Sequence, residues 1–416
     1  MRRFGSLLIL IAALGSWLSV SSAQSLPAHP SALEPSIILI SLDGFRWDYT
    51  TKAPAPNLLG LAARGVRADG LIPSYPSKTF PNHYTIVTGL YPGHHGIVAN
   101  NILDPATGRR FAPPAVAEQQ DAMWWGGEPI WVTAQRNGIL AGAMYWPGSE
   151  APIKGELPRY WNAFASALPP DERVKQVLRW VDLPDAERPR MINLYFTDVD
   201  TAGHSDGPDS PAVRDAITRV DGYLGDLLRG LEQRRVLDRF NIIVVSDHGM
   251  AATDTRRVVV LDDYISLADV DIVDINPTLG LVPKPGREDA VYRGLSRATR
   301  LEVYRRADTP ERWQYRDHPR IPAIVGGADE GWQVLRRATL EQIRAGTLRV
   351  ERGAHGYDPK FKSMRGIFIA AGPAFRQGKT VPAFENIHIY NALARILGVP
   401  PAPNDGDPAI ARRLLD

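Results

Sequence analysis

The chain contains no cysteine among its 416 residues. A disulfide-stabilised scaffold is therefore excluded, and so is a lipoprotein anchor, which needs a cysteine to carry the lipid. The sequence also has no repeat of fixed period and little excess charge, with 48 basic and 46 acidic residues. Since such a balance gives no extended basic surface, we do not expect a long nucleic acid as a partner.

Long apolar runs are also missing, apart from a short one near the start. Residues 7–14 are apolar, follow two arginines and precede a group of small residues. This order predicts a cleaved signal peptide over residues 1–23, because the run is too short for a stable membrane anchor. The prolines of residues 24–35 predict a flexible segment before a catalytic domain over residues 36–416. The expected location is the bacterial periplasm or the outside of the cell.

Short apolar runs and helical patterns alternate along most of the chain. The runs at 37–42, 191–196 and 241–246 are rich in β-branched residues and each leads to an aspartate. Such runs predict buried strands of a mostly parallel sheet. Helical patterns occupy residues 56–65, 170–181, 211–234 and 387–397. The alternation predicts an α/β fold with a central, mostly parallel sheet flanked by helices.

The pattern changes between residues 262 and 350. A candidate strand at 270–275 is followed by a candidate helix at 287–298. Residues 301–306 then alternate between apolar and polar side chains, as an exposed edge strand does. We therefore expect a small α+β lobe inserted over residues 262–350.

Aspartates and histidines follow the three apolar runs at the predicted strand ends. In an open α/β sheet, catalytic groups and ligands gather at the carboxyl ends of the strands. Carboxylates and imidazoles are zinc ligands, so the pattern predicts a metallohydrolase, although a single aspartate at a strand end often caps a helix instead. The candidates form two sets, one with Asp200, His204 and His355 and one with Asp43, Asp247 and His248.

A threonine and an asparagine are further candidates for chemistry on phosphate. Pro81 suits the first turn of a helix, which places Thr79 at the helix N-terminus, where an anion is favoured. The Thr79 hydroxyl is then a candidate nucleophile, or else a simple helix cap. Asn100 is a candidate donor to a phosphoryl oxygen, or else a turn residue.

Several motifs in this order resemble the nucleotide pyrophosphatase/phosphodiesterase family within the alkaline phosphatase superfamily. The similarity runs from about residue 35 to the end of the chain. The matching stretches are residues 41–46, 79–92, 95–97, 127–131, 146–149, 200–204, 246–250, 355–358 and 400–406. The resemblance implies one alkaline-phosphatase-like α/β domain.

The resemblance also implies a site with two zinc ions and a covalent intermediate on Thr79. One ion would be held by Asp43, Thr79, Asp247 and His248, and the other by Asp200, His204 and His355. The implied substrates are small nucleotides, either diesters, nucleoside triphosphates or dinucleotides. The implied product is a nucleoside 5′-monophosphate.

The family resemblance implies fewer of the residues that contact the substrate. Asn100 would bind a phosphate oxygen, and Phe80 would form one wall of a slot for the base, with Tyr160 or Trp161 opposite. Residues 197–199 differ from many animal members, which suggests a different substrate preference. A phospholipid diesterase that releases a choline head group, a phosphomonoesterase and a non-catalytic periplasmic zinc-binding protein remain alternatives. The oligomeric state stays open.

Overall fold

The computed structural model of the chain describes residue 1 and residues 35–415. The predicted signal peptide (residues 1–23) and flexible segment (residues 24–35) thus lie outside the described residues, except at residues 1 and 35. In the part that is described, no helix has both the length and the apolar character needed to cross a membrane.

An eight-stranded sheet forms the centre of the fold, in the order β19-β2-β18-β9-β1-β8-β6-β7. The three predicted apolar runs are β1 (Ser36–Leu42), β8 (Met191–Phe196) and β9 (Phe240–Val245), and β1 lies parallel between the other two. Every residue of these strands is buried, which explains why their sequences are mostly apolar. The remaining strands are β2 (Val66–Ala68), β6 (Ala141–Met144), β7 (Tyr160–Asn162), β18 (Phe368–Ala371) and β19 (Lys379–Val381).

Only β18 runs antiparallel to its neighbours in this sheet, pairing with β9 and β2 within the described residues. The prediction of a mostly parallel sheet is therefore confirmed.

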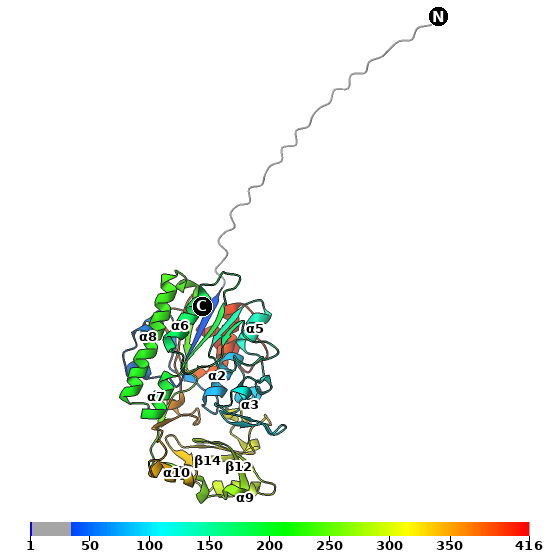
Figure 1. Ribbon diagram of the computed structural model, residues 1–416, viewed down its shortest axis with the longest axis vertical. Helices are drawn as coiled ribbons and strands as arrows, with labels where there is room; N and C mark the ends of the chain where they lie inside the picture. Colours follow the sequence, from blue (N-terminus) through cyan, green and yellow to red (C-terminus); the bar gives the residue numbers. More distant parts are fainter. Residues whose placement is uncertain (2–34, 416) are drawn as a thin grey trace. The chain divides into compact units, whose positions relative to one another are not determined.

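Helices cover both faces of the sheet, as Figure 1 shows for α6 and α8 on one side and α5 on the other. Side chains of β1 alternate between two apolar clusters, with Ile37 and Leu39 in one and Ile38 and Ile40 in the other. The first cluster includes residues of α2 (Thr79–Thr88), α5 (Ile130–Arg136) and α11 (Ile389–Leu397). The second includes residues of α1 (Pro56–Ala63), α6 (Pro170–Val181) and α8 (Pro211–Gln233).

The inserted lobe is a four-stranded antiparallel sheet with two helices. Its strands are β12 (Val270–Ile275), β13 (Thr278–Pro283), β14 (Leu301–Arg305) and β15 (Ile324–Ala328). Helices α9 (Glu288–Leu295) and α10 (Arg337–Arg344) complete it. The strand order β12-β13-β15-β14 places β14 at the edge, where its alternating sequence predicted it.

Candidate metal centre

The carboxyl ends of three neighbouring parallel strands bring the predicted ligands to one edge of the sheet. Asp43 directly follows β1, and Asp247 follows β9. Helix α7 (Asp198–Asp206) begins just after β8 and carries Asp200 and His204 one turn apart, so both lie on the same helix face. His355 comes from the loop after β17 (Gly353–Ala354).

The first predicted set of ligands converges on His248. The Nε2 atom of His248 lies 2.9 Å from Asp247 Oδ2, 3.5 Å from Asp43 Oδ1 and 3.3 Å from Thr79 Oγ1. Thr79 is the first residue of α2, and the capping position belongs to Lys78. The Thr79 hydroxyl thus faces the cluster of ligands and does not occupy the capping position of its helix.

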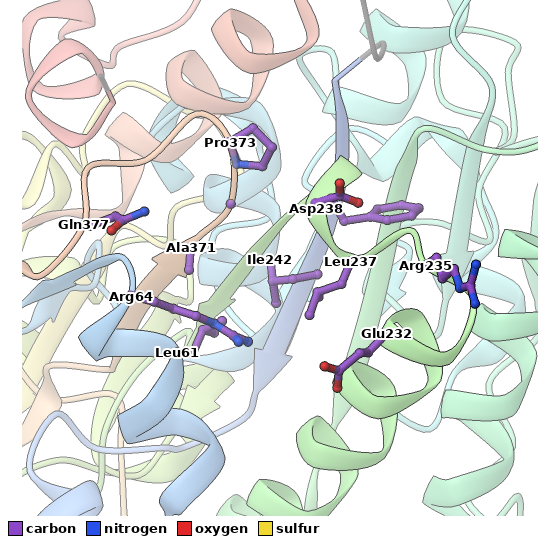
Figure 2. Close-up of a pocket in the computed structure, with 12 residues that line it drawn as sticks. Leu61, Arg64, Glu232, Arg235, Leu237, Asp238, Ile242, Ala371, Pro373 and Gln377 are labelled. Atoms are coloured by element: carbon purple, nitrogen blue, oxygen red, sulfur yellow. The ribbon is translucent and has the colours of Figure 1, made fainter. Parts of the chain in front are cut away.

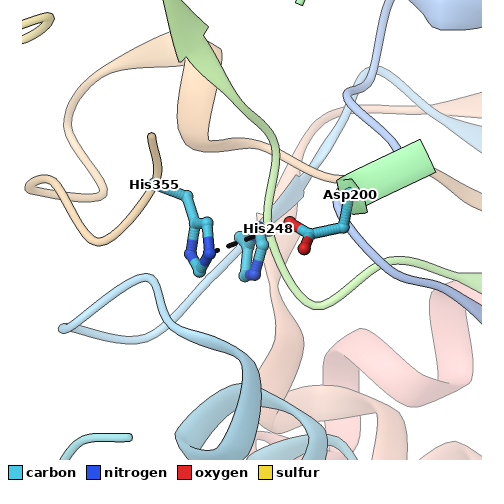
Figure 3. A group of neighbouring side chains, drawn as sticks. All are labelled: Asp200, His248 and His355. Atoms are coloured by element: carbon cyan, nitrogen blue, oxygen red, sulfur yellow. Dashed lines mark ion pairs between the residues drawn. The ribbon is translucent and has the colours of Figure 1, made fainter. Parts of the chain in front are cut away.

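The second predicted set lies beside the first. Asp200 Oδ1 is 3.5 Å from His204 Nε2. It is also 3.8 Å from His355 Nε2, as the dashed line in Figure 3 marks. The rings of His248 and His355 stack with their centroids 3.5 Å apart, which joins the two sets. All seven predicted ligand residues therefore gather in one cluster.

Three carboxylate oxygens of this cluster fit a cation. Asp43 Oδ1, Asp200 Oδ1 and Asp247 Oδ2 are buried and have no hydrogen bond of good geometry among the described residues, although Asp247 Oδ2 lies 2.9 Å from His248 Nε2. Burying a carboxylate oxygen without a partner costs free energy, and a bound cation would offset that cost.

The three predicted histidine ligands, His204, His248 and His355, are oriented by contacts with the backbone. In each, Nδ1 lies within hydrogen-bond distance of a backbone carbonyl: Gly353 O at 3.1 Å for His204, Gly249 O at 2.9 Å for His248 and Ser77 O at 2.9 Å for His355. If Nδ1 donates to that carbonyl, Nε2 is left as a free ligand atom, as in most metal-binding histidines. The donor set of carboxylate oxygens and imidazole nitrogens fits Zn²⁺.

Burial and the close approach of like charges shift the pKa values of two predicted ligands in the cluster. Burial, and then the nearby carboxylates of Asp247 and Asp200, raise the pKa of Asp43 well above its usual value. Burial and the neighbouring His248 lower the pKa of His355. A divalent cation would favour ionised Asp43 and neutral His355 together, which are the forms that bind metals.

A glycine permits the close approach of the two ligand sets. Gly44 follows Asp43 and has a φ of +65°, a conformation that glycine adopts at little cost. A Cβ atom at position 44 would lie 2.9 Å from the Cα of Asp200. Only a residue without a side chain therefore fits between the loop after β1 and helix α7.

Two buried residues that contact the cluster were not predicted. His83 lies four residues after Thr79 in α2, with Nδ1 2.9 Å from Thr79 O and Nε2 2.8 Å from Ser41 Oγ. Because both ring nitrogens have protein partners, His83 is suited to positioning rather than to holding an ion, although its Nδ1 is 3.4 Å from Asp247 Oδ2. Tyr195 donates a hydrogen bond to Asp43. The spacing of His83 from Thr79 was the available signal, while Tyr195 looked like any strand residue.

Asn100 is held beside the start of α2. The backbone N–H of Phe80 donates to Asn100 Oδ1 at 3.0 Å, so the amide NH₂ of Asn100 is the group left to donate to a ligand. The Phe80 ring contacts Phe111 edge-on, with centroids 5.2 Å apart.

The proposed second wall of the base slot is less well placed. The hydroxyl of Tyr160 donates to Glu187 O at 2.9 Å, and its ring packs in the apolar cluster on the opposite sheet face from Phe80. The structure therefore does not bring Tyr160 and Phe80 together. Trp161, the next residue of β7, points to the other face and is 37% exposed.

A cavity of about 740 Å³ lies elsewhere, at the opposite end of the sheet. Figure 2 shows it between the C-terminal end of β18, the start of β9 and the end of α8. Its lining, drawn from the described residues, contains arginines and acids but no histidine and none of the predicted ligands. The metal cluster, rather than this cavity, is the candidate site.

Comparison with known proteins agrees with the predicted family. A family model described as type I phosphodiesterase/nucleotide pyrophosphatase matches residues 37–358. An uncharacterised pyrophosphatase/phosphodiesterase of Schizosaccharomyces pombe is 41% identical, over 90% of this chain and 79% of its own length. Ectonucleotide pyrophosphatase/phosphodiesterase family member 3 of Rattus norvegicus is 36% identical over 96% of this chain, and the chain spans only 46% of that protein.

Solved structures show the same fold. Murine ectonucleotide pyrophosphatase/phosphodiesterase 5, solved as an inactive threonine-to-alanine variant in complex with AMP, has a TM-score of 0.87 and 34% identity. The match covers 92% of this chain and all of the murine chain. The alkaline-phosphatase-like α/β fold and the expectation of an enzyme are thereby confirmed. The chain belongs to the type I phosphodiesterase/nucleotide pyrophosphatase family.

Proposed function

We propose that this chain is a zinc-dependent phosphodiesterase and pyrophosphatase that releases nucleoside 5′-monophosphates from nucleotide diesters, nucleoside triphosphates or dinucleotides. The observation that carries the proposal is the position of Thr79. Its hydroxyl lies 3.3 Å from His248 Nε2 at the start of α2, beside buried carboxylate oxygens that have no hydrogen bond of good geometry among residues 35–415. A hydroxyl there is suited to nucleophilic attack.

Two zinc ions would be held by the seven clustered side chains. One position uses Asp43, Thr79, Asp247 and His248, and the other uses Asp200, His204 and His355. Bound zinc would lower the pKa of the Thr79 hydroxyl and stabilise the charge on the phosphate and on the departing oxygen.

The reaction then takes place in two displacements at phosphorus, the first by Thr79 and the second by water. Thr79 Oγ1 attacks phosphorus, the bond to the leaving group breaks, and a threonyl ester that carries the nucleoside phosphate forms. Water attacks the same phosphorus, breaks the bond to Oγ1 and releases the nucleoside 5′-monophosphate. Throughout, the Asn100 amide donates to a phosphoryl oxygen, and the N-terminus of α2 favours the anion.

Aromatic side chains account for recognition of the base. Phe80 is the proposed first wall, and Trp161 is retained as a candidate for the second. Phe164 is an additional candidate, because it is 48% exposed and contacts Tyr145 edge-on just after β6. The AMP in the murine relative's complex supports a nucleotide ligand. Removing a stacking ring is expected to raise the KM for nucleotides by roughly tenfold, since stacking of one base is worth about 1–3 kcal/mol.

A comparison of three substrates tests the proposal. Hydrolysis of a nucleotide aryl diester, an aryl phosphate and an aryl phosphocholine is measured before and after treatment with a chelator. We expect the nucleotide diester to be fastest, the chelator to abolish the activity and Zn²⁺ to restore it. Faster aryl phosphate hydrolysis would indicate a monoesterase, and faster aryl phosphocholine hydrolysis a lipid diesterase. Zinc binding without any hydrolysis would indicate a binding protein.

The same proposal includes location in the periplasm or outside the cell. It rests on the leader-like residues 1–23, and N-terminal sequencing of the protein from its native host tests it. We expect the mature chain to begin at Gln24. An intact N-terminus would contradict this location.

A further inference from the structure

The inserted lobe reaches the candidate site through one buried carboxylate. Asp274 lies in β12 and is 5% exposed. Its Oδ2 accepts from Lys78 Nζ at 2.6 Å and from Thr278 Oγ1 at 2.7 Å, and its Oδ1 accepts from Asn101 Nδ2 at 3.0 Å. Both oxygens of Asp274 therefore accept hydrogen bonds, unlike those of the carboxylates in the metal cluster.

Two partners of Asp274 are direct neighbours of the two residues proposed to act on phosphate. Lys78 precedes the proposed nucleophile Thr79, and Asn101 follows the proposed phosphate donor Asn100. The chain segments before α2 and before β4 (Ile102–Leu103) are thus bonded to the same carboxylate. One side chain of the lobe therefore bridges the two segments, in addition to the direct hydrogen bond from the Phe80 N–H to Asn100 Oδ1.

The same part of the lobe also packs against the segment that carries His355. A Cβ atom on Gly356 would lie 3.0 Å from Lys78 Cε and 3.3 Å from Cδ of Pro277, a residue of the β12–β13 turn. In addition, His355 Nδ1 is 2.9 Å from Ser77 O. The lobe therefore contacts residues adjacent to a predicted metal ligand as well.

We infer that Asp274 is a positioning residue, which sets Thr79 and Asn100 relative to each other through Lys78 and Asn101. The inference rests on the proposed function, because Thr79 and Asn100 take their roles from it. Among residues 35–415, no hydrogen bond or ion pair joins Asp274 to the side chain of Thr79 or Asn100, so its effect passes through Lys78 and Asn101. A displacement of about 1 Å at a reacting group can cost about a hundredfold in rate.

The lobe offers a matched control on the same strand. Asp271, also in β12, forms an ion pair with Lys284 at 2.6 Å, and both side chains are about half exposed. Asp271→Asn removes the same charge from the same strand without touching the candidate site. An exposed pair of this kind contributes little to stability.

The test measures kinetics and amide hydrogen exchange on the full chain. For Asp274→Asn we expect kcat for a nucleotide diester to fall about tenfold or more with KM nearly unchanged, and Asp271→Asn to match the wild type. Lys78→Met combined with Asp274→Asn should lower kcat no further than Asp274→Asn alone, because both act through one contact. Backbone amides of residues 78–80 and 100–101 should lose protection in Asp274→Asn only.

Several outcomes would overturn the inference. One is an Asp274→Asn variant with wild-type kcat and exchange, even with a lower Tm, because Asp274 would then only attach the lobe. Another is an equal response of Asp271→Asn. If the wild type hydrolyses no nucleotide, the proposed function fails, while the exchange data still decide whether Asp274 orders these segments. If Asp274→Asn does not fold, Asn101→Ala removes one contact alone and should lower both kcat and the protection around Asn100.

Discussion

Two groups of aspartates in this protein differ in how completely their oxygens are bonded: Asp104 and Asp274 form one, and Asp43, Asp200 and Asp247 of the candidate metal cluster form the other. Asp104 accepts from Arg320 Nε at 2.9 Å with one oxygen and from the backbone N–H groups of Ala106 and Thr107 with the other. Arg320 in turn donates to the carbonyl of Trp124. In the metal cluster, by contrast, three carboxylate oxygens have no hydrogen bond of good geometry among residues 35–415, and histidine nitrogens lie 2.9–3.8 Å from them. Burial of an acid alone therefore does not mark a functional site, whereas carboxylate oxygens grouped beside histidines without well-formed hydrogen bonds mark this candidate site.

The pKa values of two of these aspartates, Asp104 and Asp43, move in opposite directions. The hydrogen bond from Arg320 lowers the pKa of Asp104 to about 2. Burial, together with the nearby carboxylates of Asp247 and Asp200, raises the pKa of Asp43. The first group stabilises the fold by itself, and the second is arranged for a ligand that brings positive charge.

The largest expected effect is the loss of activity in Thr79→Ala, which removes a side chain of the candidate metal cluster. Loss of the proposed nucleophile should reduce kcat by at least about a thousandfold, because the covalent step has no substitute. Unfolding by urea should show nearly unchanged stability, since the side chain does not cap its helix. Thr79→Ser keeps the hydroxyl and should retain much more activity. Equal losses in both variants would contradict the role of the hydroxyl.

In the fully bonded group, Arg320→Met should act on stability. It leaves Asp104 buried without its cation, which typically costs about 3 kcal/mol in the free energy of unfolding. Arg300→Met removes an exposed partner of Asp329 and should cost less than about 1 kcal/mol. Urea unfolding of both variants measures the difference, and similar values would show that the Arg320 contact is not a buried ion pair in solution.

An Asp→Asn substitution should change the stability of the metal-free protein in opposite directions in the two groups. Asp43→Asn replaces a carboxyl group whose ionised form the fold disfavours, so it should stabilise the chelator-treated protein at neutral pH. Asp104→Asn removes a charge that Arg320 favours and should destabilise it by about 1–2 kcal/mol. Melting temperatures in chelator measure both, and a change of the same sign in both would contradict the comparison.

The smallest effect is a pH dependence that belongs to Asp104. Its pKa is below the ordinary value of 3.8, so ionised Asp104 stabilises the fold above about pH 4, and this contribution is lost as the pH falls towards about 2. The unfolding free energies of the wild type and of Asp104→Asn should therefore differ above pH 4 and converge near pH 2. A difference that persists at pH 2 would exclude ionisation as the cause.

Much of the fold could be predicted because its signals are local. Continuous apolar runs predicted β1, β8 and β9, and helical periodicity predicted α6 with its observed bounds. The inserted lobe was visible as a change of pattern, and β14 lies at an edge as its alternation indicated.

The site was predictable only where motifs marked it. The seven predicted ligand residues lie together, because strand ends converge at one edge of a parallel sheet. The contact of Asp274 with Lys78 joins residues 196 positions apart and has no local signal. Tyr160 was predicted, as an alternative to Trp161, to lie opposite Phe80, but its ring packs on the other face of the sheet, and the sequence did not determine which face each residue of β7 occupies.

The absence of a side chain at Gly44 limits how this candidate site can change by mutation during evolution. Any methyl group there would press on the backbone of Asp200. The positions of the predicted ligands after β1 and in α7 therefore depend on each other. A change that moves one of these segments to suit a different ion would also move the other.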